Sequence, residues 1–521
     1  MIDAGHSGNR DRSFAAYGAE TEHRKGLACY LTLYLALTLS AILPLVFVLI
    51  KGARMNAAGM RMESMAHIAE NAVLSEFHIR LHERYDLFAV DTSYGGGSGV
   101  LTNTEKHFKS YLERNASREG SMLFGTPVDL SGMRIDSALI PEARFMCDNN
   151  AQAVREQVYA YMTADPAGSA VGRILVSADQ WKGLEISGRE WKSRTEKSGE
   201  EVLKALQSKR EEAQQDVEDK QDNNENISDT EWEAASPAPS EPEEMVQNVR
   251  SFQFLPVLHQ VLGADAVLSE VQIAAGEQLS LRDVHLGSGL QAENRHGYPR
   301  ADELIFDTYV MEKTGNFTRM RGDGKLRYQT EYILCGKDTD KGNLEAVAER
   351  LLLIREGANC LYLFADEGRM GQVHAVAAVV SLILLNPELE DTLANALALA
   401  WSYLESVQDV RSLLAGYKVP LQKTGESWQT ALYELLAPGE AIRDRGGDTG
   451  FGYEEYLQGL LFLEGSTIKT KRTMDIMEMD VREITHNKSF QLDRCLDTIR
   501  IEAQASSLGV QYSYAGTAGY N

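Results

Sequence analysis

The first long apolar run in the chain extends from Leu27 to Ile50 and contains no charged side chain. A helix rises about 1.5 Å per residue, so this run is long enough to cross the roughly 30 Å hydrocarbon core of a bilayer. The apolar region of a cleaved signal peptide is shorter, about 7–15 residues, and a small-residue cleavage site follows it. The pattern therefore predicts a retained transmembrane helix at residues 27–50.

The stretch after this run keeps a helical periodicity. Apolar side chains recur at spacings of three and four residues, which is the pattern of a helix stripe that packs on another element. The stripe consists of Met55, Ala58, Met62, Met65, Ala69 and Ala72. It packs either on the protein's own globular part or on neighbouring subunits and partner helices. We expect packing within the chain near Ala69–Phe77 and partner packing nearer the membrane, at Met55–Met62.

The remaining chain offers no second apolar run long enough to span a bilayer. Val373–Leu385 is apolar over 13 residues, which is too short to cross and predicts a buried core helix. Basic residues flank the predicted span on both sides, so the positive-inside bias is slight. Because more than 450 residues follow the span, we expect residues 51–521 to lie outside the cytoplasm.

Between Tyr85 and Asp91 the sequence YDLFAVD predicts a buried strand that a polar, Gly-rich loop ends. Further on, Glu303–Met311 and Arg327–Cys335 alternate apolar and polar residues, which predicts two half-buried strands. A similar alternation on both sides of Ser507-Leu508-Gly509 predicts a terminal hairpin. Helices are expected at Glu105–Asn115, Ala151–Met162, Trp181–Glu218, Asn343–Arg355, Leu389–Leu414, Tyr453–Leu463 and Thr470–Ile484.

The net charge of −24 argues against a nucleic-acid partner, because phosphate binding needs clustered Lys and Arg. Half of this excess lies between Glu211 and Glu244, where thirteen acidic residues face a single base, Lys220. From Asp219 to Glu244 aliphatic residues are few and Pro and Ser are frequent. Such a segment buries too little apolar area to offset its ordering entropy, so it is expected to be a disordered linker.

Asp91-Thr92-Ser93-Tyr94-Gly95 follows the predicted strand and is the main candidate for a metal site. It partly resembles the D-x-S-x-S loop of von Willebrand A domains, in which Asp and Ser oxygens hold Mg²⁺. Gly95 replaces the last Ser, so only Asp91 and Ser93 remain as weak metal candidates. The alternative is a strand-end turn in which Asp91 caps backbone amides. We expect no metal or other cofactor.

Two further sets of residues are of types that bind metals or form disulfides. His78 and His82 stand four apart, a spacing that suits a metal, but the H-E-x-x-H order is absent. Cys147, Cys335, Cys360 and Cys495 either form up to two disulfides or stay free thiols. With no phosphate-binding loop and no G-x-S-x-G motif, the sequence predicts a protein that is not an enzyme.

The stretch KGLACYLTLYLALTLSAILPLVFVLIKGARMNAAGMRMESMAHIAENAVLSEF resembles the N-terminus of TadE- and TadG-type pilin-like proteins of tight-adherence (Tad) pilus systems. A closer likeness is to an uncharacterised bacterial family of Tad-associated membrane proteins. That likeness continues through Arg84–Gly95, Glu331–Asn359 and Gly450–Leu463. The resemblance implies a structural role in pilus assembly or Tad-type secretion. Lys25-Gly26 has the form of a prepilin peptidase site, but Leu31 stands where a mature pilin carries Glu, so we expect a permanent anchor.

These patterns predict an α+β protein with one transmembrane helix, a long amphipathic helix and a mixed α/β region outside the cytoplasm. The function expected is that of a structural component of a Tad-type pilus assembly or secretion apparatus. Its expected partners are the lipid bilayer and proteins of that apparatus. The alternative is a stand-alone membrane-anchored binding or adhesion module. The expected divisions are a cytoplasmic tail at 1–26, the span at 27–50, a stalk helix at 51–84, a first α/β region at 85–187, a charged helix and acidic linker at 188–245, and a second α/β region at 246–521.

Overall fold

A computed structural model describes residues 11–117, 121–123, 126–128, 132–164, 171–282, 290, 300–384, 386–507 and 509–520 of the chain. The chain divides into two compact units. Unit 1 comprises Met1–Ser75, Leu101–Glu142 and Ile499–Ala518, and unit 2 comprises Glu76–Val100, Ala143–Thr498 and Gly519–Asn521. The described residues are mostly helical with a small sheet, in agreement with the expected α+β class.

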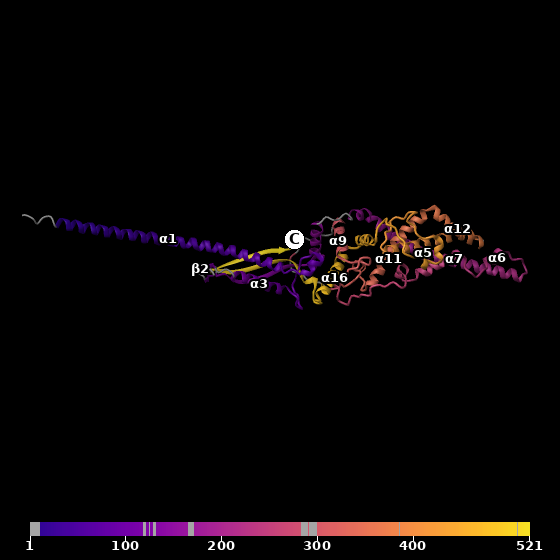
Figure 1. Cartoon of the computed structure of the whole chain (residues 1–521), viewed down its shortest axis with the longest axis horizontal. Coiled ribbons are helices and arrows are strands. Elements are labelled where there is room, and N and C mark those ends of the chain that lie inside the picture. Colours follow the sequence, from indigo (N-terminus) through magenta and orange to yellow (C-terminus); the bar gives the residue numbers. More distant parts are fainter. Residues whose placement is uncertain are drawn as a thin grey trace, which may run out of the picture. The chain divides into compact units, whose positions relative to one another are not determined.

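Unit 1 is built on one long N-terminal helix and on segments from distant parts of the sequence. Helix α1 (Asp11–Leu74) runs without a break through Pro44 (Figure 1). The other elements of this unit are α3 (Leu101–Ser117), the antiparallel pair β2 (Ser121–Leu123) and β3 (Thr126–Val128), most of β4 (Arg134–Phe145) and of β5 (Cys495–Ser507), and β6 (Val510–Gly519). The predicted terminal hairpin is confirmed, because β6 pairs with β5.

The core of unit 1 lies against the second half of α1. Helix α3 packs along α1 and buries side chains four residues apart, including Phe108 and Leu112. Strand β6 borders the same helix, since the ring of Tyr512 would lie 3.7 Å from a side-chain carbon built on Gly59. Strand β5 alternates as expected, with every second side chain buried. Its buried residues in this unit are Ile499, Ile501, Ala503, Ala505 and Ser507.

Unit 2 contains most of the helices. They are α2 (Ile79–Tyr85), α4 (Asp148–Ala164), α5 (Val171–Asp222), α6 (Asp229–Ala234), α7 (Glu241–Gln253), α8 (Val257–Leu262), α9 (Arg300–Lys313), α10 (Gln329–Cys335), α11 (Asp340–Ala365), α12 (Glu367–Ile383), α13 (Glu388–Leu414), α14 (Pro438–Ala441), α15 (Tyr453–Leu463) and α16 (Ser466–Thr485). Among the described residues they are accompanied by the short 3₁₀ turns η1 (Leu279–Leu281), η2 (Leu432–Leu436) and η3 (Leu492–Arg494). Strand β1 (Val90–Asp91) pairs antiparallel with the start of β5, in the register Val90 to Leu496.

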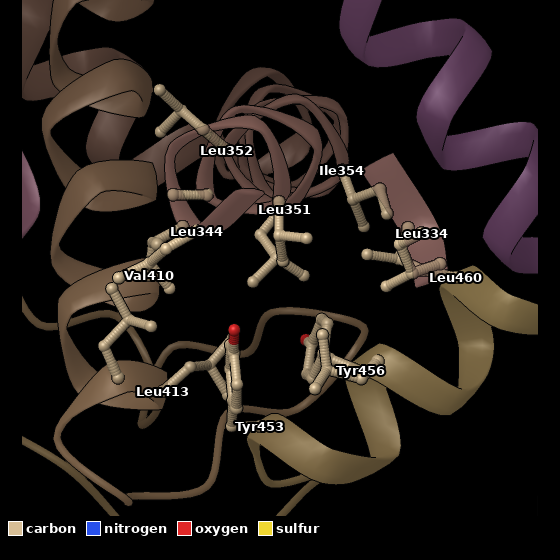
Figure 2. Packing of buried hydrophobic residues seen from close by; sticks show 14 of the residues in the cluster. Leu334, Leu344, Leu351, Leu352, Ile354, Val410, Leu413, Tyr453, Tyr456 and Leu460 are labelled. Atoms are coloured by element: carbon tan, nitrogen blue, oxygen red, sulfur yellow. The ribbon is translucent and has the colours of Figure 1, made fainter. Parts of the chain in front are cut away.

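A helical bundle forms the centre of unit 2. Helix α11 packs on α5 and α13, and α13 also packs on α5 and α12. The predicted apolar face of α11 is fully buried and consists of Leu344, Val347, Leu351 and Ile354. Figure 2 shows side chains of α11 pointing toward Leu413 of α13 and Tyr453 and Tyr456 of α15. The helices predicted from periodicity at α11, α13, α15 and α16 are therefore confirmed, and α15 has the predicted bounds.

Helices α5 and α11 approach each other closely at a pair of glycines. A side-chain carbon built on Gly188 of α5 would lie 1.8 Å from the carbonyl oxygen of Leu353 on α11. One built on Gly357 of α11 would lie 2.6 Å from the carbonyl oxygen of Leu184. Both obstacles are backbone atoms, which cannot rotate away as a side chain can. The close crossing therefore requires glycine at both positions.

We expect Gly188→Ala to destabilise unit 2 by about 2–3 kcal/mol, because the added methyl group forces α5 and α11 apart. Gly183 lies on the same helix, and a side-chain carbon there meets nothing within 4 Å. Gly183→Ala is the matched control and is expected to be neutral or to stabilise by up to about 1 kcal/mol through helix propensity. Urea unfolding of the two variants measures the difference. Equal midpoints would contradict the close crossing.

Two predicted strands are helices in the structure. Glu303–Met311 lies within α9, and Arg327–Cys335 leads into α10. Both helices are buried around most of their circumference, so the spacing of apolar residues that marks a one-sided helix is lost. In α10 three consecutive polar residues at the start, Gln329 to Glu331, are fully buried. A short run of this kind resembles a half-buried strand in sequence.

The predicted strand at Tyr85–Asp91 and the predicted stalk helix to residue 84 also differ from the structure. Helix α1 ends at Leu74, and α2 begins at Ile79 and ends at Tyr85, so only Val90–Asp91 is a strand. His78 starts α2, because its Nδ1 accepts a hydrogen bond from the amide of Leu81 at 3.2 Å. A local side-chain cap, which periodicity does not reveal, thus begins a new helix.

The segment expected to be disordered carries regular structure. Helix α5 extends to Asp222, α6 follows, and α7 begins at Glu241. Ser228 and Glu231 form a capping box at the start of α6, and Lys220 pairs with Glu231. Acidic residues at helix N-termini interact favourably with the helix dipole. Composition alone underestimates these local contacts, which order a segment poor in aliphatic residues.

Candidate functional site

The surface of α1 changes abruptly along its length. Over the predicted span every large apolar side chain from Leu27 to Ile50 is exposed, with Val48 at 67%. Gly26–Leu74 is the helix in the described chain that is long and apolar enough to cross a membrane, and the most apolar part of it is not buried by the protein. Exposure of a continuous apolar surface of this length is unstable in water. This surface therefore needs a cover that the chain itself does not provide.

The helix stripe predicted after the span is for the most part covered within unit 1. Ala58, Met62, Met65 and Ala69 are at most 4% exposed, whereas Met55 and Ala72 are half-buried. Ala66 and Val73, which the stripe did not include, are fully buried beside them. Packing within the chain thus begins at Ala58, nearer the span than expected. Of the stripe residues in the expected partner surface at Met55–Met62, Ala58 and Met62 are buried by the chain, and Met55 is half-buried.

The Asp91 loop is a closed hydrogen-bonded turn. One carboxylate oxygen of Asp91 accepts the amide of Ser93 at 2.9 Å, and the other accepts its hydroxyl at 2.8 Å. The hydroxyl of Thr92 donates to the carbonyl of Arg494. The two weak metal candidates, Asp91 and Ser93, are thus bonded to each other, which is the capped strand-end turn weighed as the alternative. Among the described residues no group of three or more His, Cys, Asp and Glu side chains could hold a metal ion.

The histidine pair that stood four apart is part of the start of α2. Burial lowers the pKa of His78, although the nearby Asp91 charge opposes this. Its Nδ1 is occupied by the helix cap, and its ring lies 4.7 Å from that of Phe490. The ring of His82 stacks on Phe88 with centroids 4.2 Å apart. Each imidazole therefore has a structural role in holding α2 to its surroundings.

The cysteines are free thiols in the structure. Burial raises the pKa of Cys335 to about 12 and that of Cys147 well above its ordinary value. Burial also raises the pKa of Cys360 and Cys495. Because the thiolate is the reactive form, these four thiols are expected to be unreactive at neutral pH. This agrees with the free-thiol alternative.

Sequence reasoning missed a buried charge network between α11, α13 and the loop after α13. Its members are Arg355, Glu405, Asp409 and Lys423, whose side chains are all fully buried. Lys423 Nζ lies 2.6 Å from Glu405 Oε1 and 2.6 Å from Asp409 Oδ1. Arg355 Nε donates to the other oxygen of Asp409 at 3.0 Å. The sequence does hold one indication of this network. Arg355 follows Leu352 by three residues and Leu351 by four, which places a charged side chain on the apolar side of α11.

Each carboxylate of this network is fully hydrogen-bonded. Glu405 accepts the amides of Gln429 and Thr430 and the Thr430 hydroxyl, and Asp409 also accepts Asn359 at 3.0 Å. Burial raises the pKa of Asp409, but the charges of Lys423 and Arg355 outweigh it, so the pKa lies below its ordinary value. The network is electrically neutral and ties three segments together. Its full satisfaction is typical of a structural core network.

A groove of about 830 Å³ opens on unit 2 between α12, the start of α7 and residues 428–433. Trp401 and Trp428 lie at its base, and both indole N–H groups donate to Thr430. Arg369 stacks 5.3 Å over the Trp428 ring, and Tyr433 is 68% exposed at the rim. An aromatic base with a polar rim suits a ligand that is partly apolar.

A model described as "Family of unknown function (DUF5702)" matches residues 236–507, slightly more than half of the sequence. The match begins between α6 and α7 and ends with β5, so it covers α7 to α16 and the buried charge network but neither α1 nor α5. The sequence matches no curated protein and no solved structure. The description of the family states no activity or ligand.

Proposed function

The chain belongs to the family of unknown function DUF5702, and we propose that it is a non-enzymatic structural component of a Tad-type pilus assembly or secretion apparatus, anchored in the cell membrane by α1. The residues after the span would lie outside the cytoplasm. The family description supplies no activity, so the proposal rests on α1 and on the likeness of the sequence around it to TadE- and TadG-type proteins.

The observation that carries the proposal is the continuity of α1. One helix presents a bare apolar surface at Leu27–Ile50 and then, without a break, becomes the core of unit 1 at Ala58. In a bilayer the first part is covered by lipid, and the second part fixes unit 1 directly at the membrane surface. A rigid connection of this kind suits a protein that transmits position from membrane to exterior. An enzyme tethered by a flexible linker would not need it.

The exposed part of α1 also has a side suited to helix packing. Cys29, Thr32, Ala36 and Ser40 are small and follow spacings of three and four residues, so they form one stripe along the helix. The hydroxyls of Thr32 and Ser40 donate to carbonyls of their own helix, which leaves the stripe smooth and without free polar groups. Small side chains let two helices approach closely in lipid. This stripe supports lateral contact with another membrane helix.

Anchoring and orientation are tested by cysteine labelling in intact cells. We expect Asn226→Cys, an exposed position in the loop before α6, to react with a membrane-impermeant maleimide. Ser13→Cys, which precedes the span, should react only after lysis. Carbonate washing should leave the protein in the membrane fraction. Labelling of Asn226→Cys only after lysis would show the opposite orientation and end the proposal of an exterior role.

The packing stripe is tested by two matched substitutions. Ala36 and Ala41 are both exposed and point about 140° apart around the helix, at roughly 100° per residue. We expect Ala36→Leu to reduce co-purification with Tad apparatus proteins by about tenfold, since the larger side chain removes about 1–2 kcal/mol of close packing. Ala41→Leu should change it little, and both variants should insert normally. Equal co-purification of the two variants would remove the support from the stripe.

A stand-alone binding or adhesion module is the second candidate, and the aromatic groove beneath α12 favours it. Under this alternative the span serves only as a tether, and Ala36→Leu has no effect. Tyr433→Ala at the groove rim would instead reduce attachment of cells to a surface. The two candidates thus predict opposite results for the same pair of variants.

A further inference from the structure

A buried carboxylate in unit 2 lacks the hydrogen bonds that such a group normally has. Asp307 of α9 has no exposed side-chain surface, and its Oδ2 accepts no hydrogen bond from the residues that the structure describes. Its Oδ1 is in contact with Nζ of Lys469, on α16. Buried polar groups are nearly always hydrogen-bonded, so an exception of this kind requires an explanation.

The surroundings of the pair supply a group that can move protons. Lys469 is 1% exposed, and its Nζ lies 3.2 Å from Oε2 of Glu303, one helical turn before Asp307 on α9. The other oxygen of Glu303 accepts a hydrogen bond from Arg155 at 2.6 Å, which fixes the carboxylate in place. Glu303 is 17% exposed, so it connects the buried pair with solvent. A buried amine, a buried acid and a second carboxylate thus converge.

We propose that Lys469 and Asp307 condense spontaneously in the folded protein to form an amide bond, which joins α16 covalently to α9. The product explains the bare carboxylate, because an amide needs far less solvation than a carboxylate and an ammonium group. No external oxidant, reductant or cofactor is needed.

The reaction is balanced by the loss of one water. A proton passes from the Lys469 ammonium to the Asp307 carboxylate, and the free amine attacks Cγ of the resulting acid. Glu303 takes a second proton from the attacking nitrogen and gives it to the hydroxyl that leaves Cγ. The C–N bond forms, the C–O bond breaks, and water departs along the exposed side of Glu303. Burial favours the acid form that this step needs, because it raises the pKa of Asp307 to about 6 against the opposing charge of Lys469.

The buried network at Lys423 provides an internal comparison. There too a buried lysine contacts two carboxylates, but each carboxylate accepts several further hydrogen bonds, from Arg355, Asn359 and the amides of Gln429 and Thr430. Donors to a carboxylate favour its charged form, which an amine does not attack. Lys423 is therefore expected to remain a free ammonium group, whereas Lys469 reacts.

Peptide mapping of the full-length protein, purified in detergent, tests the proposal. Trypsin should yield residues 301–313 joined to residues 446–471, at the summed mass less one water, because an acylated Lys469 is not cleaved. Fragmentation should place the link at Asp307 and Lys469. The linear peptide 419–423, which ends at Lys423, should appear in full yield as the control. Recovery of peptides 301–313 and 446–469 as separate linear species would overturn the proposal.

Variants separate the roles of the three residues. Lys469→Arg and Asp307→Ala should abolish the joined peptide. Glu303→Gln should slow its formation by about 100-fold, the usual contribution of a general acid–base group, and aged samples should still accumulate it. Formation in Glu303→Gln at the rate of the natural protein would refute the catalytic role of Glu303. If a variant fails to fold, the mapping of the unsubstituted protein still decides whether the bond exists.

Discussion

Replacement of Met62 by Asp is expected to unfold unit 1 locally while unit 2 keeps its structure. Met62 is 1% exposed in the stripe of α1 that packs on α3. Its burial stabilises unit 1 by about 1.5–3 kcal/mol, and a carboxylate in its place adds the desolvation of an unpaired charge. The expected loss is about 4 kcal/mol or more. Hydrogen exchange of α3 and of the β5–β6 hairpin, followed by mass spectrometry, measures this loss in unit 1.

Met60 provides the matched control because it lies two residues away on the same helix and is 71% exposed. Met60→Asp makes the same chemical change on the opposite side of α1, and exchange in unit 1 should stay within about 0.5 kcal/mol of the unsubstituted protein. If Met62→Asp left exchange unchanged, the stripe would have to be covered by a partner and not by the chain itself. Selective loss of partner binding by Met60→Asp would place a docking surface on that side.

Replacement of Lys423 by Met is expected to destabilise unit 2 by about 3–5 kcal/mol, because it leaves an uncompensated charge in the core. Without Lys423 the two buried carboxylates, Glu405 and Asp409, share only Arg355 as a cation. Urea unfolding of the full chain in detergent measures the effect. The double variant Lys423→Met/Glu405→Gln restores neutrality and should recover part of the loss.

The surface pair of Lys204 with Glu200 on α5 is the control for a lysine–glutamate contact outside the core. These side chains are 73% and 46% exposed, and exposed pairs contribute about 0–1 kcal/mol. Lys204→Met should therefore change stability very little. If Lys423→Met behaved like Lys204→Met, or if the double variant were no more stable than the single one, the buried network would not have the role inferred from its geometry.

The sequence predicts best where one physical signal dominates. The apolar run at Leu27–Ile50 is unambiguous because length and absence of charge suffice to identify it. Helices α13 and α15 are rich in Leu, a strong helix former, so both are recognised as helices although they are largely buried. The terminal hairpin follows from strict alternation on both sides of Gly509. These elements need no knowledge of what they pack against.

Prediction fails where tertiary contacts decide. Helices α9 and α10 are enclosed by other elements, so their polar residues are buried and their pattern is not that of a surface helix. The start of α2 depends on the side chain of His78 as a cap. The partnership of Lys469 with Asp307 joins residues far apart in sequence, and no local pattern indicates it. The ordering of the acidic segment depends on the capping boxes at Ser228 and Ser240 and on the ion pairs of Lys220 with Glu231 and of Arg210 with Glu243.

The division of the chain into units has a consequence for biosynthesis. Unit 1 needs α1, α3 and the hairpin that ends near Ala518, so its core cannot close until almost the whole chain has left the ribosome. Elongation proceeds at about 5–20 residues per second, so the Met and Ala side chains after the span remain uncovered for tens of seconds. In the anchored arrangement proposed above, α1 would already be at the membrane during that interval. The newly made stripe therefore depends on a temporary cover before β5 and β6 arrive.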